Sequence, residues 1–132
     1  MTDQATREAR EKVVHEHLEA ENNLDFDAAV ATFEHPRYEL IGTDTVHDGP
    51  EAVAEYYSQL LEAFPVQSYE IISIRHTDDA VVLEFWMTGT SKEPPGRSFK
   101  VQMTAFFLFD GTGLVCERVY FDSGSILRQI SG

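Results

Sequence analysis

The chain places its helical periodicity in the first half and its long strand-like segments in the second half. Between Ala5 and about Glu21, apolar side chains such as Val14 and Leu18 recur every three or four residues, which is the period of an amphipathic helix. From Ser68 to Asp122 the pattern changes to longer segments rich in β-branched and aromatic residues, separated by short turns. Helices followed by a meander of strands are typical of an α+β domain.

The spacing predicts three helices in the N-terminal half, five strands and a last helical turn. Asp25 is a natural N-cap of the second helix, and Pro50 suits the first position of the third. The short connections are expected at Glu93-Pro94-Pro95-Gly96 and at the tight hairpin Asp110-Gly111-Thr112-Gly113. The expected helices are 5–21, 26–33 and 50–64, the strands 38–41, 68–75, 80–90, 98–109 and 114–122, and the final turn 125–130.

The length fits one domain over residues 1–132, close to the commonest domain size. The formal net charge is -13, so the surface repels phosphate backbones and anionic lipids. We therefore expect neither nucleic-acid nor membrane partners. Adaptation to high salt is one source of such a composition, and an ordinary acidic bacterial protein is the other.

Cys116 is the single cysteine, so no intrachain disulfide forms, which fits a reducing cytoplasm. The polar stretch from Met1 to Arg10 does not read as a signal peptide. No glycine-rich phosphate loop, zinc-ligand spacing or nucleophile elbow is present. We expect a cytoplasmic protein without a metal or cofactor.

Several local strings, in this order and spacing, resemble the SnoaL-like polyketide cyclases of the nuclear-transport-factor-2-like superfamily. The resemblance covers nearly the whole chain and implies a cone of curved sheet and helices around a pocket. The strings are Asn23-Leu24-Asp25-Phe26-Asp27, Ala31-Thr32-Phe33, His47-Asp48-Gly49-Pro50-Glu51-Ala52-Val53, Ala63-Phe64-Pro65, Thr88-Gly89-Thr90, Asp110-Gly111-Thr112-Gly113, Tyr120-Phe121-Asp122 and Leu127-Arg128-Gln129.

The resemblance implies a general acid/base at Asp122, the position of the aspartate that closes the ring in the cyclases. Two departures from the family pattern weigh against polyketide cyclisation itself: Ser91 replaces a frequent histidine, and the Pro-Pro connection is short. Steroid isomerases share the fold and offer a second template. On it, His17 falls at the oxyanion-hole tyrosine and Tyr57 at a supporting tyrosine, while Leu40 and Ala105 replace the catalytic base and the protonated aspartate. That template therefore argues against steroid isomerisation.

The inward positions of the family imply which side chains line the pocket. Alternate residues of a strand share a face, and the expected catalytic set is Asp122, His17 and Arg118. The expected ligand-binding residues are Tyr57, Glu84, Trp86, Met103, Tyr120 and Phe33.

Each candidate also has a purely structural interpretation. Asp122 can cap the final helical turn, Arg118 can pair with Glu84 or Asp122, and His17 can face solvent. The leading hypothesis is a cofactor-independent acid–base enzyme, cyclase- or isomerase-like, acting on a small hydrophobic carbonyl compound. A ligand-binding module without activity and a dimeric interaction domain are the alternatives. We expect a homodimer through an outward sheet face carrying Phe106, Leu108, Val119 and Phe121.

Overall fold

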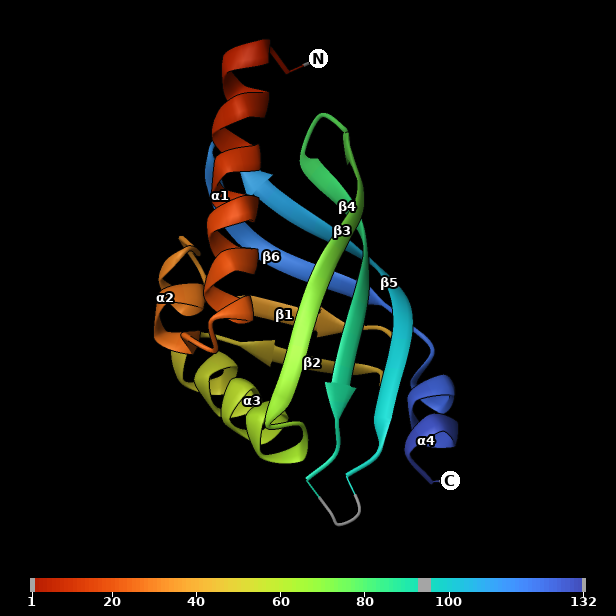
Figure 1. Ribbon diagram of the computed structural model, residues 1–132. Coiled ribbons are helices and arrows are strands. Elements are labelled where there is room, and N and C mark those ends of the chain that lie inside the picture. The colour runs from red at the N-terminus through yellow and green to blue at the C-terminus, as the bar shows by residue number, and fades with distance from the viewer. Residues whose placement is uncertain (1, 93–95, 132) are drawn as a thin grey trace.

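The computed structural model describes residues 2–92 and 96–131, in which helices pack against a curved six-stranded sheet (Figure 1). Residues 93–95 of the expected Glu93–Gly96 connection lie outside the described residues. The helices are α1 (Gln4–Asn22), α2 (Phe26–Ala31), α3 (Pro50–Ala63) and α4 (Ser123–Ser131), and the strands are β1 (Arg37–Leu40), β2 (Thr45–Asp48), β3 (Val66–His76), β4 (Ala80–Thr90), β5 (Ser98–Asp110) and β6 (Gly113–Tyr120).

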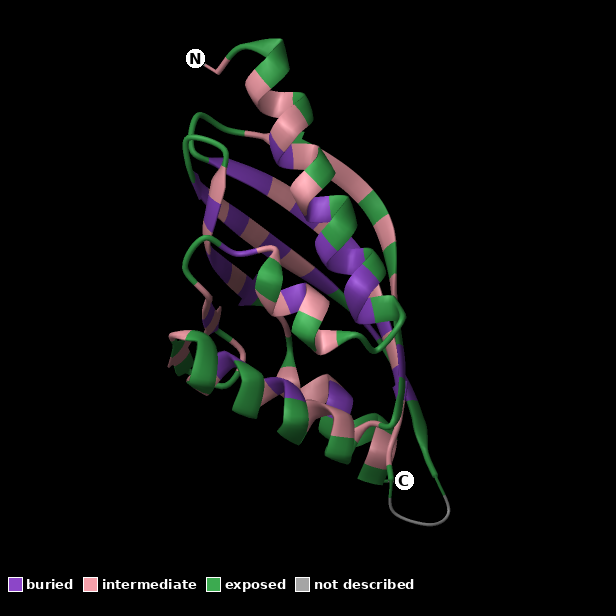
Figure 2. Ribbon diagram, turned by 90° about the vertical axis from the view of Figure 1, so that its left-hand side faces the viewer, coloured by how far each residue is buried: buried purple, intermediate pink, exposed green. Residues whose placement is uncertain are grey.

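The sheet is mixed, with the strand order β2-β1-β6-β5-β4-β3. All neighbouring strands are antiparallel except β1 and β6, which run parallel. Helix α1 packs against β3, β4 and β6, and α3 contacts β1 and β2. The expected α+β plan, with three helices of the N-terminal half on a curved sheet, is confirmed. The inner side of the sheet and the facing side of α1 carry most of the buried residues (Figure 2).

Two aspartates cap helix starts, and one of them is the predicted Asp25. Asp3 accepts a hydrogen bond from the backbone N–H of Thr6 at the start of α1, and Asp25 caps α2 through the N–H of Ala28. Strand β2 was missed, because four mostly polar residues on the sheet edge carry no apolar alternation. The terminal turn is a nine-residue helix, α4, packed on β5.

The buried face of the long strands carries the apolar core. In β4 the buried positions include Phe85 and Met87, whereas Glu84 and Trp86 between them are partly exposed. In β5 the alternation places Met103 inward. The expected inward face of β4 was therefore wrong, although that of β5 was correct.

In β6 a change of register shifts the alternation. Cys116 pairs with Leu108, but Phe109 pairs with Leu114, so one extra residue lies between them. Such a bulge reverses which positions point inward. On the far side of it, Glu117 and Val119 are buried. The inward face predicted for β6, which carries Arg118 and Tyr120, is the outer face.

The outer face of the sheet differs from the face predicted for dimerisation. Phe106 and Leu108 lie there and are half-buried, and the Phe106 ring packs against Tyr120. Val119 is instead a core residue, and Phe121 lines the internal cavity described below. The apolar outer patch is smaller than expected, and the homodimer stays a prediction.

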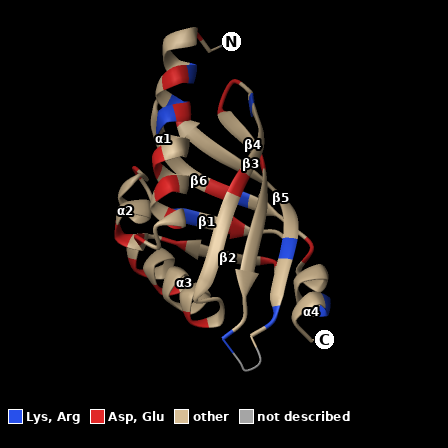
Figure 3. Cartoon of the chain, viewed as in Figure 1, with Lys and Arg blue, Asp and Glu red and all other residues tan. Residues whose placement is uncertain are grey.

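Acidic residues are spread over the helices, the turns and several strands (Figure 3). The 23 Asp and Glu against 10 Lys and Arg account for the net charge. No helix among the described residues combines the length and the apolar character needed to cross a bilayer.

Arg10 ties α1 to two hairpin turns of the sheet, β3–β4 and β5–β6. Its side chain is buried, donates to the carbonyl oxygens of Gly111 at 2.8 Å and Asp78 at 2.9 Å, and lies over the Phe109 ring. The two turns follow β3 and β5. The Arg10 guanidinium therefore holds the N-terminal half of α1 against the sheet.

Replacing Arg10 with Met removes both donors while keeping most of the apolar stem. Charge-assisted hydrogen bonds contribute about 1.5–3 kcal/mol each, so we expect the free energy of unfolding to fall by about 2–4 kcal/mol in urea titrations. Arg7→Met is the matched control, because Arg7 lies on the same helix and bonds the nearby Thr2 hydroxyl instead of a sheet turn. An equal loss in the two variants would contradict the assigned role of Arg10.

Candidate functional site

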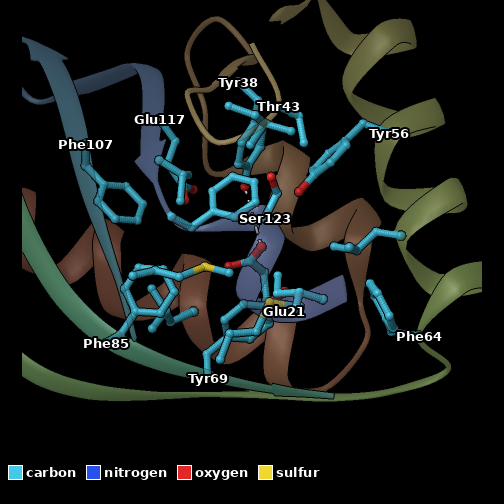
Figure 4. A pocket seen from close by; sticks show the side chains of 18 of the residues that line it. Glu21, Tyr38, Thr43, Tyr56, Phe64, Tyr69, Phe85, Phe107, Glu117 and Ser123 are labelled. Carbon is cyan, nitrogen blue, oxygen red and sulfur yellow. Dashed lines mark hydrogen bonds between the residues drawn. The ribbon is translucent and has the colours of Figure 1, made fainter. Parts of the chain in front are cut away.

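An apolar cavity of about 360 Å³ lies between the helices and the inner face of the sheet. Aromatic and aliphatic side chains form most of its wall. Two carboxylates, Glu21 of α1 and Glu117 of β6, also line it (Figure 4). They mark the end of the cavity nearest His17, which we call the inner end. The lining residues are Leu18, Glu21, Tyr38, Leu40, Thr43, Tyr56, Leu60, Phe64, Tyr69, Phe85, Met87, Met103, Phe107, Glu117, Val119, Phe121, Ser123, Ile126 and Leu127.

His17 lies directly behind this wall and is fully buried. Its Nδ1 is 2.9 Å from the Thr32 hydroxyl, which itself donates to the carbonyl oxygen of Ala29 at 2.6 Å. Since that hydroxyl proton is used, His17 Nδ1 is the donor to Thr32. The other ring nitrogen, Nε2, therefore faces the cavity side.

Four oxygen atoms surround His17 Nε2, and the Tyr57 hydroxyl is one of them, at 3.4 Å. The Tyr38 hydroxyl lies at 2.8 Å, Glu117 Oε1 at 3.0 Å and Glu21 Oε1 at 3.4 Å. Glu21 comes four residues after His17 on α1, so the helix places both side chains on one face. Glu117 reaches the same point from β6, opposite Phe107.

Two buried tyrosines link His17 to Glu21. The Tyr38 and Tyr57 hydroxyls share a short hydrogen bond, and the Tyr57 hydroxyl donates to Glu21 Oε2 at 3.1 Å. With His17 protonated, the bonds run in one direction from Nε2 through Tyr38 and Tyr57 to Glu21. Burial raises the pKa of both tyrosines well above 10, so the two phenols keep their protons.

The cluster shifts the protonation of its charged members. Burial disfavours the imidazolium, but Glu21 and Glu117 outweigh this and raise the pKa of His17 to about 9. Burial raises the pKa of Glu21 to about 7, helped by repulsion from Glu117 and opposed by His17 and the two phenols. Near neutral pH the histidine is therefore charged, and Glu21 readily gains or loses its proton.

Glu117 has the least satisfied carboxylate of the cluster. Its side chain is buried, and among the described residues its Oε1 has no hydrogen-bond partner. Its polar neighbour is His17 Nε2, whose hydrogen bond goes to the Tyr38 hydroxyl. A buried carboxylate oxygen without a donor is costly.

The same three side chains have metal-ligand chemistry. The ligand atoms of His17, Glu21 and Glu117 all lie within 4.8 Å of one another. A metal ion requires the neutral imidazole, whereas the two carboxylates raise the pKa of His17 to about 9. The three groups can therefore hold a proton or a metal ion, but not both at His17.

The structure brings four of the predicted site residues to this region. Met103 lines the cavity, and His17 and Tyr57 form the cluster behind it. Phe33 packs edge-on against the His17 ring, with the centroids 5.3 Å apart. These residues come from α1, the end of α2, α3 and β5.

Four other residues were predicted to line the pocket, and this placement is wrong, because their side chains lie on the outer face of the sheet. Glu84 accepts from the Ser73 hydroxyl at 2.5 Å, Trp86 lies under the Lys100 ammonium, and Tyr120 is largely exposed. Arg118 donates to Glu39 at 2.7 Å, not to Glu84 or Asp122.

Asp122 also lies away from the cavity. Its side chain is 66% exposed, is 3.5 Å from Arg128, and accepts from the N–H of Ser125 at 3.2 Å. The structural interpretation of Asp122 as a helix cap is confirmed, because it precedes α4. Its expected place in the pocket is wrong.

The residues that sequence reasoning missed are Glu21, Glu117, Tyr38 and Tyr56. Glu21 had a usable signal, its four-residue spacing from His17. Glu117 shares a face with the apolar Val119, which favours an inward position once the apolar face is taken as buried. Leu40 and Ala105 are apolar at the places expected from the steroid-isomerase template; Leu40 lines the cavity and Ala105 is buried.

Comparison with known proteins identifies the sequence relationship. The family model of the SnoaL-like domain matches residues 14–118, which include the second half of α1 and most of the sheet. No curated protein matches the sequence.

Solved structures show the same fold at low sequence identity. A hypothetical protein from Catenulispora acidiphila with a ketosteroid isomerase-like fold, in complex with trimethylamine, is 18% identical; the match covers 90% of this chain and 92% of that chain with a TM-score of 0.82. An NTF2-like protein of unknown function from Burkholderia pseudomallei is 16% identical, with 94% and 98% coverage and a TM-score of 0.83. SalBIII, an epoxide hydrolase/cyclase-like enzyme of pyran ring formation in the polyether salinomycin, is 21% identical, with 90% and 95% coverage and a TM-score of 0.79.

The protonation of His17 predicts how stability depends on pH. Its pKa is raised from 6.5 to about 9 on folding. The stabilisation that the protonated His17 gives to the folded state is therefore complete below pH 6.5 and is lost as the pH rises through about 9. The shift corresponds to at most about 3 kcal/mol. We expect urea unfolding to show falling stability between these two pH values.

His17→Gln should flatten this pH dependence, since no titrating ring remains. His15→Gln is the control, because His15 lies on the same helix and is exposed. A wild-type protein whose stability is constant or rises from about pH 6.5 to about pH 9 would contradict a buried imidazolium.

Proposed function

The chain belongs to the SnoaL-like domain family, and we propose that it is an acid–base enzyme acting on a small hydrophobic carbonyl compound. The observation that carries the proposal is Glu21, a buried carboxyl group with a pKa raised by burial to about 7 that faces an apolar cavity. A general base is most effective when its pKa lies near the working pH. Glu21 replaces Asp122 as the proposed proton acceptor.

The base acts on a carbon next to the carbonyl group. Glu21 Oε1 takes the proton, while Oε2 stays bonded to the Tyr57 hydroxyl. Electrons from the broken C–H bond move toward the carbonyl oxygen and form an enolate. The enolate either takes the proton back from Glu21 at a different, conjugated carbon or attacks a second carbonyl group, whose oxygen then takes that proton. The first outcome is an isomerisation and the second is a ring closure, so no redox partner is needed.

Tyr56 is the proposed donor to the developing oxyanion. It lines the cavity, and burial together with Glu21 and Glu117 raises the pKa of its phenol. A phenol that keeps its proton donates a hydrogen bond to the enolate oxygen without being consumed. The aromatic wall keeps water away from the reacting groups and strengthens this bond.

His17 is a positioning residue in this proposal. Thr32 fixes its ring orientation, and its positive charge opposes the rise in the pKa of Glu21 that burial causes. The phenols of Tyr38 and Tyr57 connect it to Glu21. His17 thereby keeps the pKa of Glu21 near neutrality.

A ligand-binding protein without activity is the second candidate. The Catenulispora structure with trimethylamine supports a small-molecule pocket in this fold, and the unsatisfied Glu117 oxygen favours a bound donor. Binding alone, however, does not require a carboxyl group that titrates near neutrality. The distinction is therefore whether Glu21 moves protons.

Exchange of the acidic C–H protons of β-tetralone in heavy water tests the proposed proton transfer. β-Tetralone is a small hydrophobic ketone, and NMR follows the loss of its α-proton signal. We expect the protein to accelerate the exchange and Glu21→Gln to reduce the acceleration by about a hundredfold or more, the usual contribution of a general base. The acceleration of the exchange by the protein should increase as the pH rises through about 7, because Glu21 then ionises.

Glu19→Gln is the matched control, since Glu19 lies on the exposed side of the same helix. Thermal unfolding of each variant checks that the fold is retained. Equal acceleration by wild type and folded Glu21→Gln would remove Glu21 from the mechanism. Binding of β-tetralone without acceleration would favour the ligand-binding alternative.

A further inference from the structure

The inner end of the cavity has more acceptors than donors. Glu117 is only 4% exposed, and among the described residues its Oε1 has no hydrogen-bond donor. Water-free burial of such an oxygen is unfavourable unless a partner approaches. Because Glu117 lines the cavity, that partner can come from a bound molecule.

Apart from Tyr56, which is proposed to serve the oxyanion, the phenols and the imidazole nearest Glu117 already donate elsewhere. His17 Nε2 bonds the Tyr38 hydroxyl, Tyr38 bonds Tyr57, and Tyr57 bonds Glu21. The Tyr69 hydroxyl on the cavity wall donates to Gln67. Among the described residues, Glu117 Oε1 is thus left with an ion pair to His17 but no hydrogen bond, and a ligand in the cavity can supply one.

The wall of the cavity suits a positive charge. The lining contains two glutamates and, within the described residues, no Lys, Arg or His. Aromatic ring faces attract cations within about 6 Å of the ring centre. The aromatic lining residues are Tyr38, Tyr56, Phe64, Tyr69, Phe85, Phe107 and Phe121.

We propose that the cavity binds a hydrophobic amine in its protonated form, with the ammonium N–H donated to the Glu117 carboxylate and the apolar part packed against the aromatic wall. The inference rests on the proposed function and narrows its substrate class to carbonyl compounds that also carry an amino group. A cavity of about 360 Å³ falls in the range of small-molecule sites. Anionic molecules are excluded, because the two glutamates repel them.

Four probes of one shape separate the contributions of charge and hydrogen bonding. N,N-Dimethylbenzylamine carries a charged N–H, benzyltrimethylammonium has the charge without the N–H, isobutylbenzene is the neutral isostere, and phenylacetate is the anion. Binding is measured by NMR titration near neutral pH. We expect N,N-dimethylbenzylamine to bind about tenfold or more tightly than isobutylbenzene, as for a charge-assisted hydrogen bond. The quaternary ion should be intermediate and phenylacetate the weakest.

Glu117→Gln keeps the volume and removes the negative charge, so the preference for N,N-dimethylbenzylamine over isobutylbenzene should disappear. Glu70→Gln is the control, because Glu70 is exposed on β3. Glu117→Asp provides a second variant in case Glu117→Gln does not fold: it keeps the charge but withdraws the oxygen, and should erase the advantage of the N–H over the quaternary ion.

The outcomes separate this inference from the proposed function. Equal binding of N,N-dimethylbenzylamine and isobutylbenzene would overturn the amine proposal while leaving proton exchange on β-tetralone intact. An amine preference that survives in folded Glu117→Gln would overturn the assigned hydrogen bond. Failure of all four probes and of β-tetralone to bind would contradict the small-molecule pocket itself.

Discussion

The burial of two glutamates beside one histidine constrains the whole inner end of this structure. A buried charge is unfavourable unless other charges and hydrogen bonds compensate it. Compensation here comes from His17, held by Thr32, and from the phenols of Tyr38 and Tyr57. These side chains belong to α1, β1 and α3 and the end of α2, so the cluster requires those elements to meet at one point above β6. Arg10 fixes the other end of α1 to the hairpin turns.

The same cluster gives the cavity its chemistry. Apolar walls raise the pKa of Glu21, and His17 limits that rise, so that Glu21 titrates near neutrality. Glu117 takes part differently, because it lines the cavity and one of its oxygens is buried without a hydrogen-bond donor among the described residues. One glutamate is thus proposed to move a proton and the other to recognise a donor. A single cavity of this kind supports both catalysis and selectivity.

Most of the fold was predictable from the sequence, whereas the composition of the site was only partly so. Long periodic segments such as α1 and β4 follow from local patterns, but the short polar β2 has none. The faces of β4 and β6 were assigned wrongly because family positions were preferred over the burial of the apolar side. In β6, the bulge before Cys116 also changes the alternation. His17 and Tyr57 were expected in the site, but their glutamate partners depend on contacts between distant elements.

The protonation of Glu21 in the ligand-free protein is the most direct measurement of this account. Carbon NMR of the labelled side-chain carboxyl group, followed across pH, reports it without any substrate, and Glu21→Gln identifies the signal. The account predicts a titration near a pKa of about 7, raised by burial against the opposing charge of His17. A titration at or below the ordinary glutamate value of about 4.3 would show that Glu21 is fully ionised at neutral pH, and would contradict its role as a base tuned by the cavity.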